Sequence, residues 1–265
     1  MSETAGPAPG YKDMPEHFVD FEPSPKRIRV SFGGETIVDT TNGLIVYERG
    51  HVPVYYMPRA DVAMDLLTAS AHSTHCPFKG DASYWNITVG DRVAENALWS
   101  YPDPISAVPE LKGHAAFYWN RMERWLEEDE EIFVHARDPH VRIDILPSSR
   151  RVEISLDGTV LADSTQALFL FETGLPVRYY IPAEDLRHDV LVVSELETAC
   201  PYKGIADYHH VDLAGTRHEN LVWHYTSPVR EAAPIRDYHC FFNERVDIRV
   251  DGLLQDRPKT KWSPK

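Results

Sequence analysis

Short segments in which apolar and polar residues alternate recur along most of the chain. A period of two is the pattern of a β-strand that buries one face. It predicts strands at residues 28–32, 44–48, 54–57, 84–89, 97–101, 116–119 and 152–156. Asp157-Gly158 follows the last of these and is typical of a two-residue hairpin turn. Only residues 61–67 and 186–191 indicate a short helical turn, so the chain is expected to be mainly β.

The strand pattern occurs twice because the chain is an internal duplication. An offset of 124 residues aligns residues 27–121 with residues 151–245 without a gap. Identical pairs include Gly50/Gly174, Tyr56/Tyr180, Asp61/Asp185, Cys76/Cys200, Lys79/Lys203, Asn96/Asn220 and Trp99/Trp223. A repeat of this length is a whole domain rather than one unit of a solenoid. We therefore expect two tandem copies of a small sandwich or half-barrel with few short helices.

The expected domain boundaries follow from the limits of the repeat. They are a flexible N-terminal arm (1–25), the first copy (26–126), a connection (127–149), the second copy (150–252) and a C-terminal tail (253–265). The connection contains an alternating stretch at 141–145, which predicts a strand crossing between the domains. The acidic run at 127–131 is expected to be solvated surface. Two copies in one chain can pack as a pseudo-twofold pair, so we expect a monomer.

The composition of the chain indicates which partners and which cellular compartment to expect for the protein. A formal net charge of −14 argues against a nucleic-acid partner. No apolar run is long enough to span a membrane, and the first residues lack the pattern of a signal peptide. Three cysteines cannot form a disulfide framework and indicate a reducing compartment. The composition therefore predicts a cytoplasmic protein.

The motif Cys-Pro-aromatic-Lys-Gly occurs at residues 76–80 and again at 200–204. As a structural turn, it uses proline to preset φ, glycine to adopt positive φ and cysteine as a small buried hydrophobe, and its lysine faces solvent. A turn alone does not need a lysine, however, and Lys79 lies close enough to Cys76 to favour a thiolate. Three interpretations stay open: a structural turn, a ligand site, and cysteine catalysis. The candidate catalytic residues are Cys76, Lys79, Cys200 and Lys203.

Aromatic residues concentrate around this motif, together with a few carboxylates. An aromatic wall with a few polar groups is typical of a small-molecule pocket. The candidate ligand-binding residues are Glu48, Tyr55, Tyr56, Tyr84, Trp85, Glu95, Trp99 and Tyr101 in the first copy, and Glu172, Tyr179, Tyr180, Tyr208, His209, Glu219, Trp223 and Tyr225 in the second. We expect the two motif lysines to matter more to a ligand than the motif cysteines. Truncation of Lys79 should then leave stability nearly unchanged.

Histidines distinguish the two copies. The second copy carries His209, His210, His218, His224 and His239, where the first has Trp85, Asn86, Ala94, Ser100 and Ala115. No metal site can therefore be shared by both copies, and histidines scattered over strands are expected to be satisfied polar groups. We expect neither a metal nor a cofactor. A site confined to the second copy is the alternative, and the Trp85/His209 difference indicates that one copy is specialised or degenerate.

The ordered set of motifs resembles a known family. It comprises Tyr-Tyr-x-Pro-x-x-Asp (55–61), Cys-Pro-aromatic-Lys-Gly-x-Ala-x-Tyr (76–84) and Glu-Asn-x-x-Trp-x-Tyr (95–101), repeated at 179–185, 200–208 and 219–225. This set is similar to the domain-of-unknown-function family numbered 427, whose bacterial members include tandem two-domain proteins. The resemblance implies a β-tent fold, shared with methionine sulfoxide reductase B and the ligand-binding domain of cereblon.

The chain lacks the residues required for two properties that are associated with the family or its fold. Relatives in the fold often hold a structural zinc with two Cys-x-x-Cys knuckles, and this chain has none. A nucleotidyltransferase label is sometimes attached to the family, but the chain lacks a Gly-Ser followed by Asp-x-Asp and a phosphate-binding loop.

The sequence leads to one functional hypothesis and two alternatives. The leading hypothesis is a duplicated domain that binds or converts a small molecule beside the motif turn. The first alternative is a protein-interaction or scaffold module in which the motif is only a turn. The second alternative is a cysteine-dependent enzyme.

Overall fold

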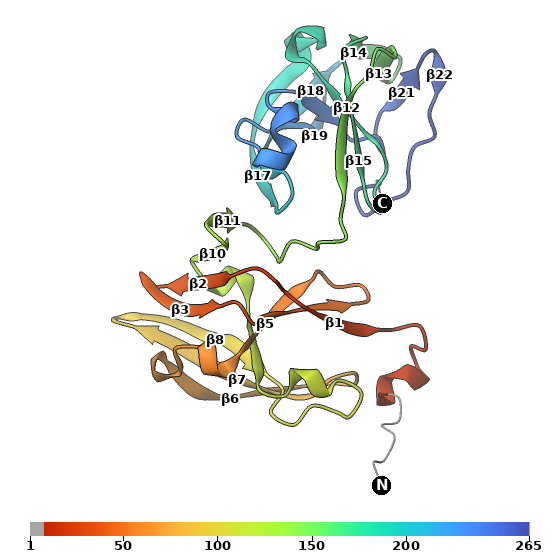
Figure 1. Ribbon diagram of the computed structural model, residues 1–265. Helices are drawn as coiled ribbons and strands as arrows, with labels where there is room; N and C mark the ends of the chain where they lie inside the picture. The colour runs from red at the N-terminus through yellow and green to blue at the C-terminus, as the bar shows by residue number, and fades with distance from the viewer. Residues whose placement is uncertain (1–7, 265) are drawn as a thin grey trace. The chain divides into compact units, whose positions relative to one another are not determined.

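The structure of the chain, a computed structural model, describes residues 8–264. It divides between Arg137 and Asp138 into two compact units, and each unit holds a seven-stranded and a four-stranded sheet (Figure 1). All strand pairs within these sheets are antiparallel. The expectation of a mainly β chain built from two similar halves is confirmed.

In the first unit the large sheet has the strand order β1-β4-β5-β9-β8-β7-β6. Its strands are β1 (Val19–Pro23), β4 (Leu44–Glu48), β5 (Val54–Pro58), β6 (Leu67–Cys76), β7 (Gly80–Val89), β8 (Arg92–Ser100) and β9 (His114–Phe117). The small sheet has the order β11-β10-β2-β3. Its strands are β2 (Ile28–Phe32), β3 (Glu35–Thr40), β10 (Arg124–Glu127) and β11 (Glu130–Ile132).

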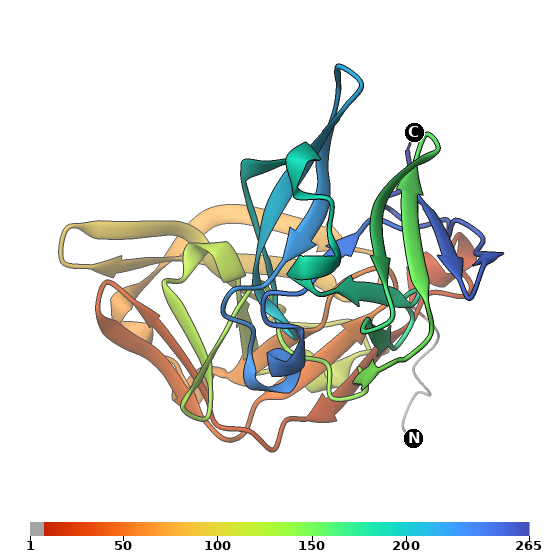
Figure 2. The same cartoon turned by 90° about the horizontal axis from the view of Figure 1, so that it is seen from above.

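The second unit repeats this topology. Its large sheet has the order β12-β15-β16-β20-β19-β18-β17, and its small sheet the order β14-β13-β21-β22. The strands are β12 (Ile143–Pro147), β13 (Val152–Leu156), β14 (Thr159–Ser164), β15 (Leu168–Glu172), β16 (Arg178–Ile181), β17 (Leu191–Cys200), β18 (Gly204–Leu213), β19 (Thr216–His224), β20 (His239–Phe241), β21 (Asp247–Val250) and β22 (Leu253–Leu254). The β7–β8 hairpin in one unit and the β18–β19 hairpin in the other project as twisted ribbons (Figure 2).

The helices of the described residues are short 3-10 segments. They are η1 (Pro9–Lys12), η2 (Arg59–Asp61), η3 (Met64–Leu66), η4 (Pro109–Leu111), η5 (Trp119–Arg121), η6 (Ala183–Asp185), η7 (His188–Val190) and η8 (Arg230–Ile235). The two predicted helical turns correspond to η3 and η7, and the strand predicted at 116–119 ends earlier because η5 begins at Trp119. No helix in the described part of the chain is long and apolar enough to cross a membrane.

The large sheets extend beyond the boundaries that the repeat predicts. Strand β1 lies in the expected arm and pairs with β4, and β12 lies in the expected connection and pairs with β15. The stretch at 141–145 therefore does contain a strand, but β12 belongs to the sheet of the second unit. Residues 1–7 of the expected arm lie outside the described residues.

Each large sheet has two buried faces. One face, here called the core face, packs against the small sheet; in the first unit it brings Met57, Ile87 and Leu98 against Val30 and Ile37. The opposite face, here called the tyrosine face, gathers a second cluster. In the first unit that cluster contains Val46, Tyr56, Ala82, Tyr84, Tyr101, Val108, Leu111 and Ala116, and in the second Leu168, Leu170, Tyr180, Ala206, Trp223, Tyr225, Ala232, Ile235 and Cys240. The period-two alternation of each strand thus supplies two apolar layers.

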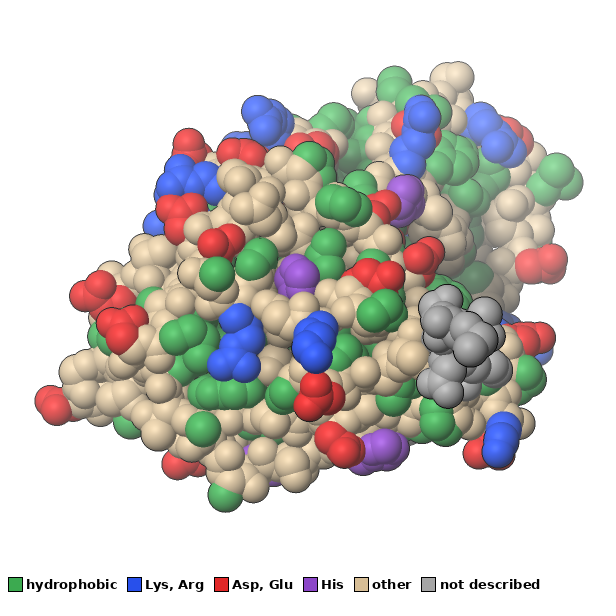
Figure 3. All heavy atoms as spheres, turned by 60° about the horizontal axis from the view of Figure 1, so that its bottom comes forward, with side chains coloured by type: hydrophobic (Ala, Val, Ile, Leu, Met, Phe, Trp, Pro, Cys, Tyr) green, Lys and Arg blue, Asp and Glu red, His purple; other side chains and the backbone are tan. Residues whose placement is uncertain are grey.

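Charged side chains of both signs are interspersed on the surface seen in Figure 3. Many form local ion pairs, and one recurs in both units: Arg27 pairs with Asp39, and Arg151 pairs with Asp163 at 2.5 Å. These pairs join neighbouring strands of the small sheets but are exposed, so solvent and salt screen them and they contribute little to stability.

A glycine test follows from the backbone of the motif turns. Gly80 and Gly204 have φ of +102° and +105°, and an added Cβ on Gly204 would lie 3.1 Å from the carbonyl oxygen of Ser227. We expect Gly80→Ala and Gly204→Ala each to lower the free energy of unfolding by about 1–3 kcal/mol, measured by urea denaturation.

Gly90→Ala is the matched control. Gly90 has φ of +57° with no heavy atom within 4 Å of an added Cβ. Its counterpart in the second copy is already alanine, Ala214, with φ of +50°. Gly90→Ala should therefore lower the free energy of unfolding clearly less than the two motif variants do. Equal losses of unfolding free energy in all three variants would contradict this account of the turn.

Candidate functional site

The motif turn closes the hairpin between β6 and β7. The backbone N–H of Lys79 donates to the carbonyl of Cys76 at 3.2 Å, and Gly80 then takes positive φ. Proline at the second position suits this geometry. The second copy repeats it, with Lys203 N–H donating to Cys200 at 3.3 Å. The backbone thus forms the tight turn that proline and glycine favour, but a turn by itself does not account for the lysine.

Both motif lysines are buried in ion pairs. The Nζ of Lys79 donates to a carboxylate oxygen of Glu48, and the Nζ of Lys203 donates to Glu172 at 2.6 Å. Lys79 and Lys203 are each only 8% exposed, so the expectation of a solvent-facing lysine is wrong. Burial alone would raise the pKa of Glu48, but the hydrogen bond and charge of Lys79 outweigh it and lower that pKa below its usual value.

These ion pairs show that the large sheet is strongly curved. Glu48 ends β4, whereas Lys79 precedes β7, which lies four strand spacings away in the sheet. That separation is roughly 19 Å in a flat sheet, further than a lysine and a glutamate can reach together. The tyrosine face must therefore be the concave side, and the ion pair spans it.

A cavity of about 370 Å³ opens in the first unit, and its walls come from both faces of the large sheet: Tyr56, Tyr84 and Tyr101 belong to the tyrosine-face cluster, whereas Tyr55, Phe117 and Trp125 belong to the core-face cluster. Its lining combines aromatic rings with a few titratable groups. The lining residues are Val46, Glu48, His51, Val52, Pro53, Val54, Tyr55, Tyr56, Lys79, Tyr84, Trp99, Tyr101, Phe117, Tyr118, Trp119, Trp125, Val134 and His135. The volume lies within the range of small-molecule sites.

The structure brings most of the first-copy candidates to this cavity. They are Glu48, Tyr55, Tyr56, Lys79, Tyr84, Trp99 and Tyr101. Trp85 is not among them: it packs against the cluster of the core face, with the Arg59 guanidinium 4.5 Å from its ring centre. Glu95 is exposed on β8 and does not line the cavity either. Alternation explains the failure for Trp85, because it follows Tyr84 directly and points to the opposite face.

The motif cysteines are half-buried rather than presented to the cavity. Cys76 packs against the cluster of the tyrosine face and is not a lining residue. Cys240, outside the motif, is buried, and burial raises the pKa of its thiol to about 12. A thiol with so high a pKa remains protonated at neutral pH and is a poor nucleophile.

Four aromatic cavity residues were not predicted: Phe117, Tyr118, Trp119 and Trp125. The indoles of Trp119 and Trp125 stack at 4.1 Å, and burial raises the pKa of Tyr118 to about 12. By strand register the counterpart of Trp125 is Ile248, since Trp125 pairs with Val30 and Ile248 pairs with the equivalent Ile154. Trp119 and Trp125 have no aromatic counterpart in the second copy, so the repeat gave no signal for them, whereas Phe117 has Phe241 as its counterpart and was missed although the repeat contains it.

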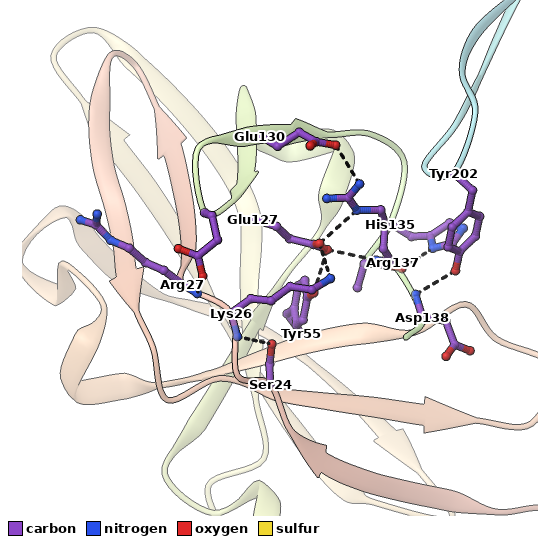
Figure 4. A network of polar contacts seen from close by, with 12 residues as sticks. Ser24, Lys26, Arg27, Tyr55, Glu127, Glu130, His135, Arg137, Asp138 and Tyr202 are labelled. Carbon is purple, nitrogen blue, oxygen red and sulfur yellow. Dashed lines mark hydrogen bonds and ion pairs between the residues drawn. The ribbon is translucent and has the colours of Figure 1, made fainter. Parts of the chain in front are cut away.

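The cavity wall is supported by a buried carboxylate from the acidic run. Glu127 is 2% exposed, accepts hydrogen bonds from Tyr55 at 2.8 Å and Arg137 at 3.0 Å, and forms an ion pair with Lys26 (Figure 4). Burial alone would raise the pKa of Glu127, but the hydrogen bond and charge of Lys26 lower it. The expectation that this run is only solvated surface is therefore wrong at its first residue. Arg137 also pairs with Glu130 at 2.8 Å, so the chain is held onto the first unit as far as Arg137.

The second copy has the same strand framework but different side chains at some of the positions that line the cavity in the first copy. Trp223 donates to the hydroxyl of Tyr180 at 3.1 Å, as Trp99 does to Tyr56 at 3.0 Å. The candidates Glu172, Lys203, Tyr180, Tyr208, Trp223 and Tyr225 gather around the tyrosine face, whereas Tyr179 packs in the core-face cluster and Glu219 is exposed. Cys200 is half-buried, like Cys76.

Arg178 occupies the position that corresponds to Val54, a lining residue of the first-copy cavity. Its guanidinium forms a buried bidentate ion pair with Glu244, with both distances 2.8 Å. It also lies 5.5 Å from the ring centre of Trp223 and 5.4 Å from that of Trp262. Side chains of the second copy thus occupy a place that is part of a cavity wall in the first.

Three second-copy histidines, His209, His224 and His239, meet on the core face. One ring nitrogen of each lies within 4.8 Å of the others. Burial and the two neighbouring imidazoles lower the pKa of His239 to about 4, so it is neutral at pH 7. The Nδ1 atoms of all three are buried without a hydrogen-bond partner among the described residues. The expectation of scattered, satisfied histidines does not describe these three.

The buried ion pair generates a stability prediction. Lys79→Met leaves the Glu48 carboxylate with His17 as its remaining partner, at 3.1 Å, so we expect a loss of about 1–3 kcal/mol in urea denaturation. This revises the expectation that truncating Lys79 is nearly neutral. Unchanged stability would show that the pair is not formed.

The same pair predicts a pH dependence. Because the folded pKa of Glu48 is lowered, its contribution is complete above the unfolded value of about 4.3 and is lost as pH falls through the folded value. Going from pH 6 to pH 3, Glu48→Gln/Lys79→Met should therefore lose less stability than the wild type. An equal loss in both proteins would contradict the lowered pKa.

Comparisons with known proteins agree with the duplicated architecture. The family described as "Domain of unknown function (DUF427)" matches the chain twice, over residues 20–128 and 144–252. The two matches include all but the first residue of β1 and of β12, the strands that the repeat alone had left outside the domains. No curated protein matches the chain. The chain is a tandem two-domain member of this family of unknown function.

Proposed function

We propose that the first copy binds a small molecule in its aromatic cavity. The ligand has a flat or apolar body and a group that accepts hydrogen bonds, such as a carboxylate or a carbonyl. The observation that carries this proposal is a buried lysine in the wall of a cavity that is otherwise mostly aromatic and apolar.

The aromatic lining suits a flat ligand. Trp99, Tyr118, Trp119 and Trp125 provide ring faces and edges around about 370 Å³. Rings of this kind contribute large contact areas and favour stacking or edge-on packing of another planar group. Tyr55 and Tyr56 are held by hydrogen bonds to Glu127 and Trp99, so part of the wall is fixed before a ligand binds.

The polar end favours an acceptor over a cation. The Nζ of Lys79 uses one hydrogen bond for Glu48, and an ammonium has three N–H donors. The carboxylate of Glu48 is already engaged on both oxygens, by Lys79 and by His17. His51 and His135 are the other titratable lining side chains besides tyrosines, so Glu48 is the one carboxylate among the described lining residues.

The cysteine-dependent alternative has less support. Cys76 lies behind the wall of the cavity rather than in it, so a ligand in the cavity would not meet its sulfur. We infer that the motif cysteine contributes packing and the motif lysine contributes recognition.

We further propose that the protein is a cytoplasmic monomer. The cysteines Cys76, Cys200 and Cys240 are unpaired, which suits a reducing compartment. The duplication supplies in one chain the two domains that a single-domain relative could supply as a dimer. Light scattering should give the mass of one chain at micromolar concentration, and a stable dimer would contradict the proposal.

A ligand screen tests the binding proposal. Small aromatic carboxylic acids and carboxamides should include compounds that raise the melting temperature, because a ligand that binds the native state stabilises it. Their affinities are then measured by calorimetry on three variants. Val54→Arg should abolish binding, since it places in the cavity the side chain that the second copy holds at this position. Lys79→Met should weaken binding roughly tenfold or more, the loss expected for one charge-assisted hydrogen bond.

Lys203→Met is the matched control. It removes the equivalent buried ion pair from the second copy and should lower stability similarly, but ligand affinity should stay at the wild-type value. Hits that bind Val54→Arg as well as the wild type would overturn the assignment to this cavity. A screen without hits would favour the alternative of a protein-interaction module.

A further inference from the structure

Three neighbouring strands of the second unit bring His209, His224 and His239 together. His224 on β19 is directly opposite His239 on β20, and His209 on β18 is opposite Val222, two residues from His224. Residues opposite each other, and residues two apart on one strand, share a face of a sheet. All three imidazoles therefore project from the core face at one place.

The rings are close and their polar atoms are unsatisfied. Ring centres are 4.6 Å apart for His224 and His239, 5.1 Å for His209 and His224, and 5.6 Å for His209 and His239. The three Nδ1 atoms are buried and have no hydrogen-bond partner among the described residues. Buried polar atoms in folded proteins are nearly always paired, so three unpaired nitrogens at one place indicate a missing partner.

The three histidines adjoin apolar side chains on one side and are partly accessible to solvent on the other. On the core face the histidines adjoin Val222, Ile181 and Phe241, all fully or almost fully buried. His239 is 9% exposed, whereas His209 and His224 are half-buried, which leaves a path from solvent.

The first copy carries different side chains at the positions equivalent to these histidines. Its equivalent positions hold one large ring, Trp85, with the small residues Ser100 and Ala115. The Arg59 guanidinium covers Trp85, and the residue equivalent to Arg59 is Ala183. The second copy thus exchanges one indole and two small side chains for three imidazoles, and it removes the cation that would repel a bound metal ion.

We propose that His209, His224 and His239 form a binding site for one divalent transition-metal ion, with zinc the expected metal. Three imidazoles with an open fourth position are an established ligand set for zinc, and imidazole also suits copper and nickel. Ligand nitrogens at 2.0–2.1 Å from a tetrahedral ion lie roughly 3.4 Å apart, so rotations of the rings must bring the present 4.8 Å spread together. The site replaces the expectation that the chain holds no metal.

A cobalt titration tests the proposal, because cobalt(II) substitutes for zinc and absorbs visible light when its coordination is tetrahedral. Full-length protein without an affinity tag should bind one equivalent of Co²⁺ with visible absorption, and Zn²⁺ should displace it. His224→Ser should weaken binding roughly 100-fold or more. The triple variant His209→Trp/His224→Ser/His239→Ala should abolish binding, and the first copy shows that the fold accommodates its side chains at these positions.

His218→Ala is the control for a histidine outside the cluster; alanine is its first-copy counterpart, and Co²⁺ affinity should not change. Circular dichroism and the urea midpoint establish that each variant is folded. Wild-type protein that takes up no Co²⁺ or Zn²⁺ at 100 µM free metal, roughly ten thousandfold above a 10 nM affinity, would overturn the proposal. Binding that survives in the folded triple variant would overturn it equally, because the metal would then lie elsewhere.

Discussion

A buried lysine–glutamate pair spans the large sheet of each domain. It joins the motif turn before β7 to the end of β4, and the two elements are four strand spacings apart in the sheet. Only a curved sheet allows this contact. Curvature makes the tyrosine face concave, and residues of this face supply part of the cavity wall of the first copy. The motif is therefore both a turn and the anchor of the curvature. The same pair in the second copy, Lys203 and Glu172, shows that the anchor does not depend on what the concave face holds.

Because each strand alternates between the two faces, the duplicated domains could diverge on one face without disturbing the other. On the concave face, the second copy replaces Val54 with Arg178 and holds that guanidinium with Glu244. On the core face, it replaces Trp85 with His209 and assembles three imidazoles. Tyr208 and His209 are adjacent in sequence but point to opposite faces, which separates the two changes. One framework thus carries a cavity in one copy and a histidine cluster in the other.

The sequence was most informative where a short-range rule decides the outcome. Strand alternation located β2, β4 and β13 to the residue, and the turn chemistry of Asp157-Gly158 appears as two consecutive positive φ angles. Lys79 and Glu48 were both predicted as site residues, but the ion pair between them was not predicted, because it depends on the curvature of the sheet. Trp85 was assigned to the wrong face, although alternation from Tyr84 could have placed it correctly.

The copy-to-copy comparison was a poor guide to what differs between the copies. The repeat gave no signal for Trp119 and Trp125, which have no aromatic counterpart in the second copy. The absence of matching histidines in the first copy led to His224 and His239 being interpreted as scattered. Their proximity comes from the order β18-β19-β20 in the sheet, a long-range arrangement that spacing along the chain does not reveal. Strand β1 was missed for a similar reason, because it precedes the detectable repeat and is ordered by pairing with β4.

The claim that equivalent positions carry different sites in the two copies is tested most directly by crystals grown with zinc. An anomalous difference map, recorded on both sides of the zinc absorption edge, locates bound zinc without any assumption about its ligands. The account predicts one strong peak among His209, His224 and His239, and none beside Trp85, Ser100 and Ala115. A map with no peak at the histidines, or with peaks at the equivalent place in both copies, would contradict it.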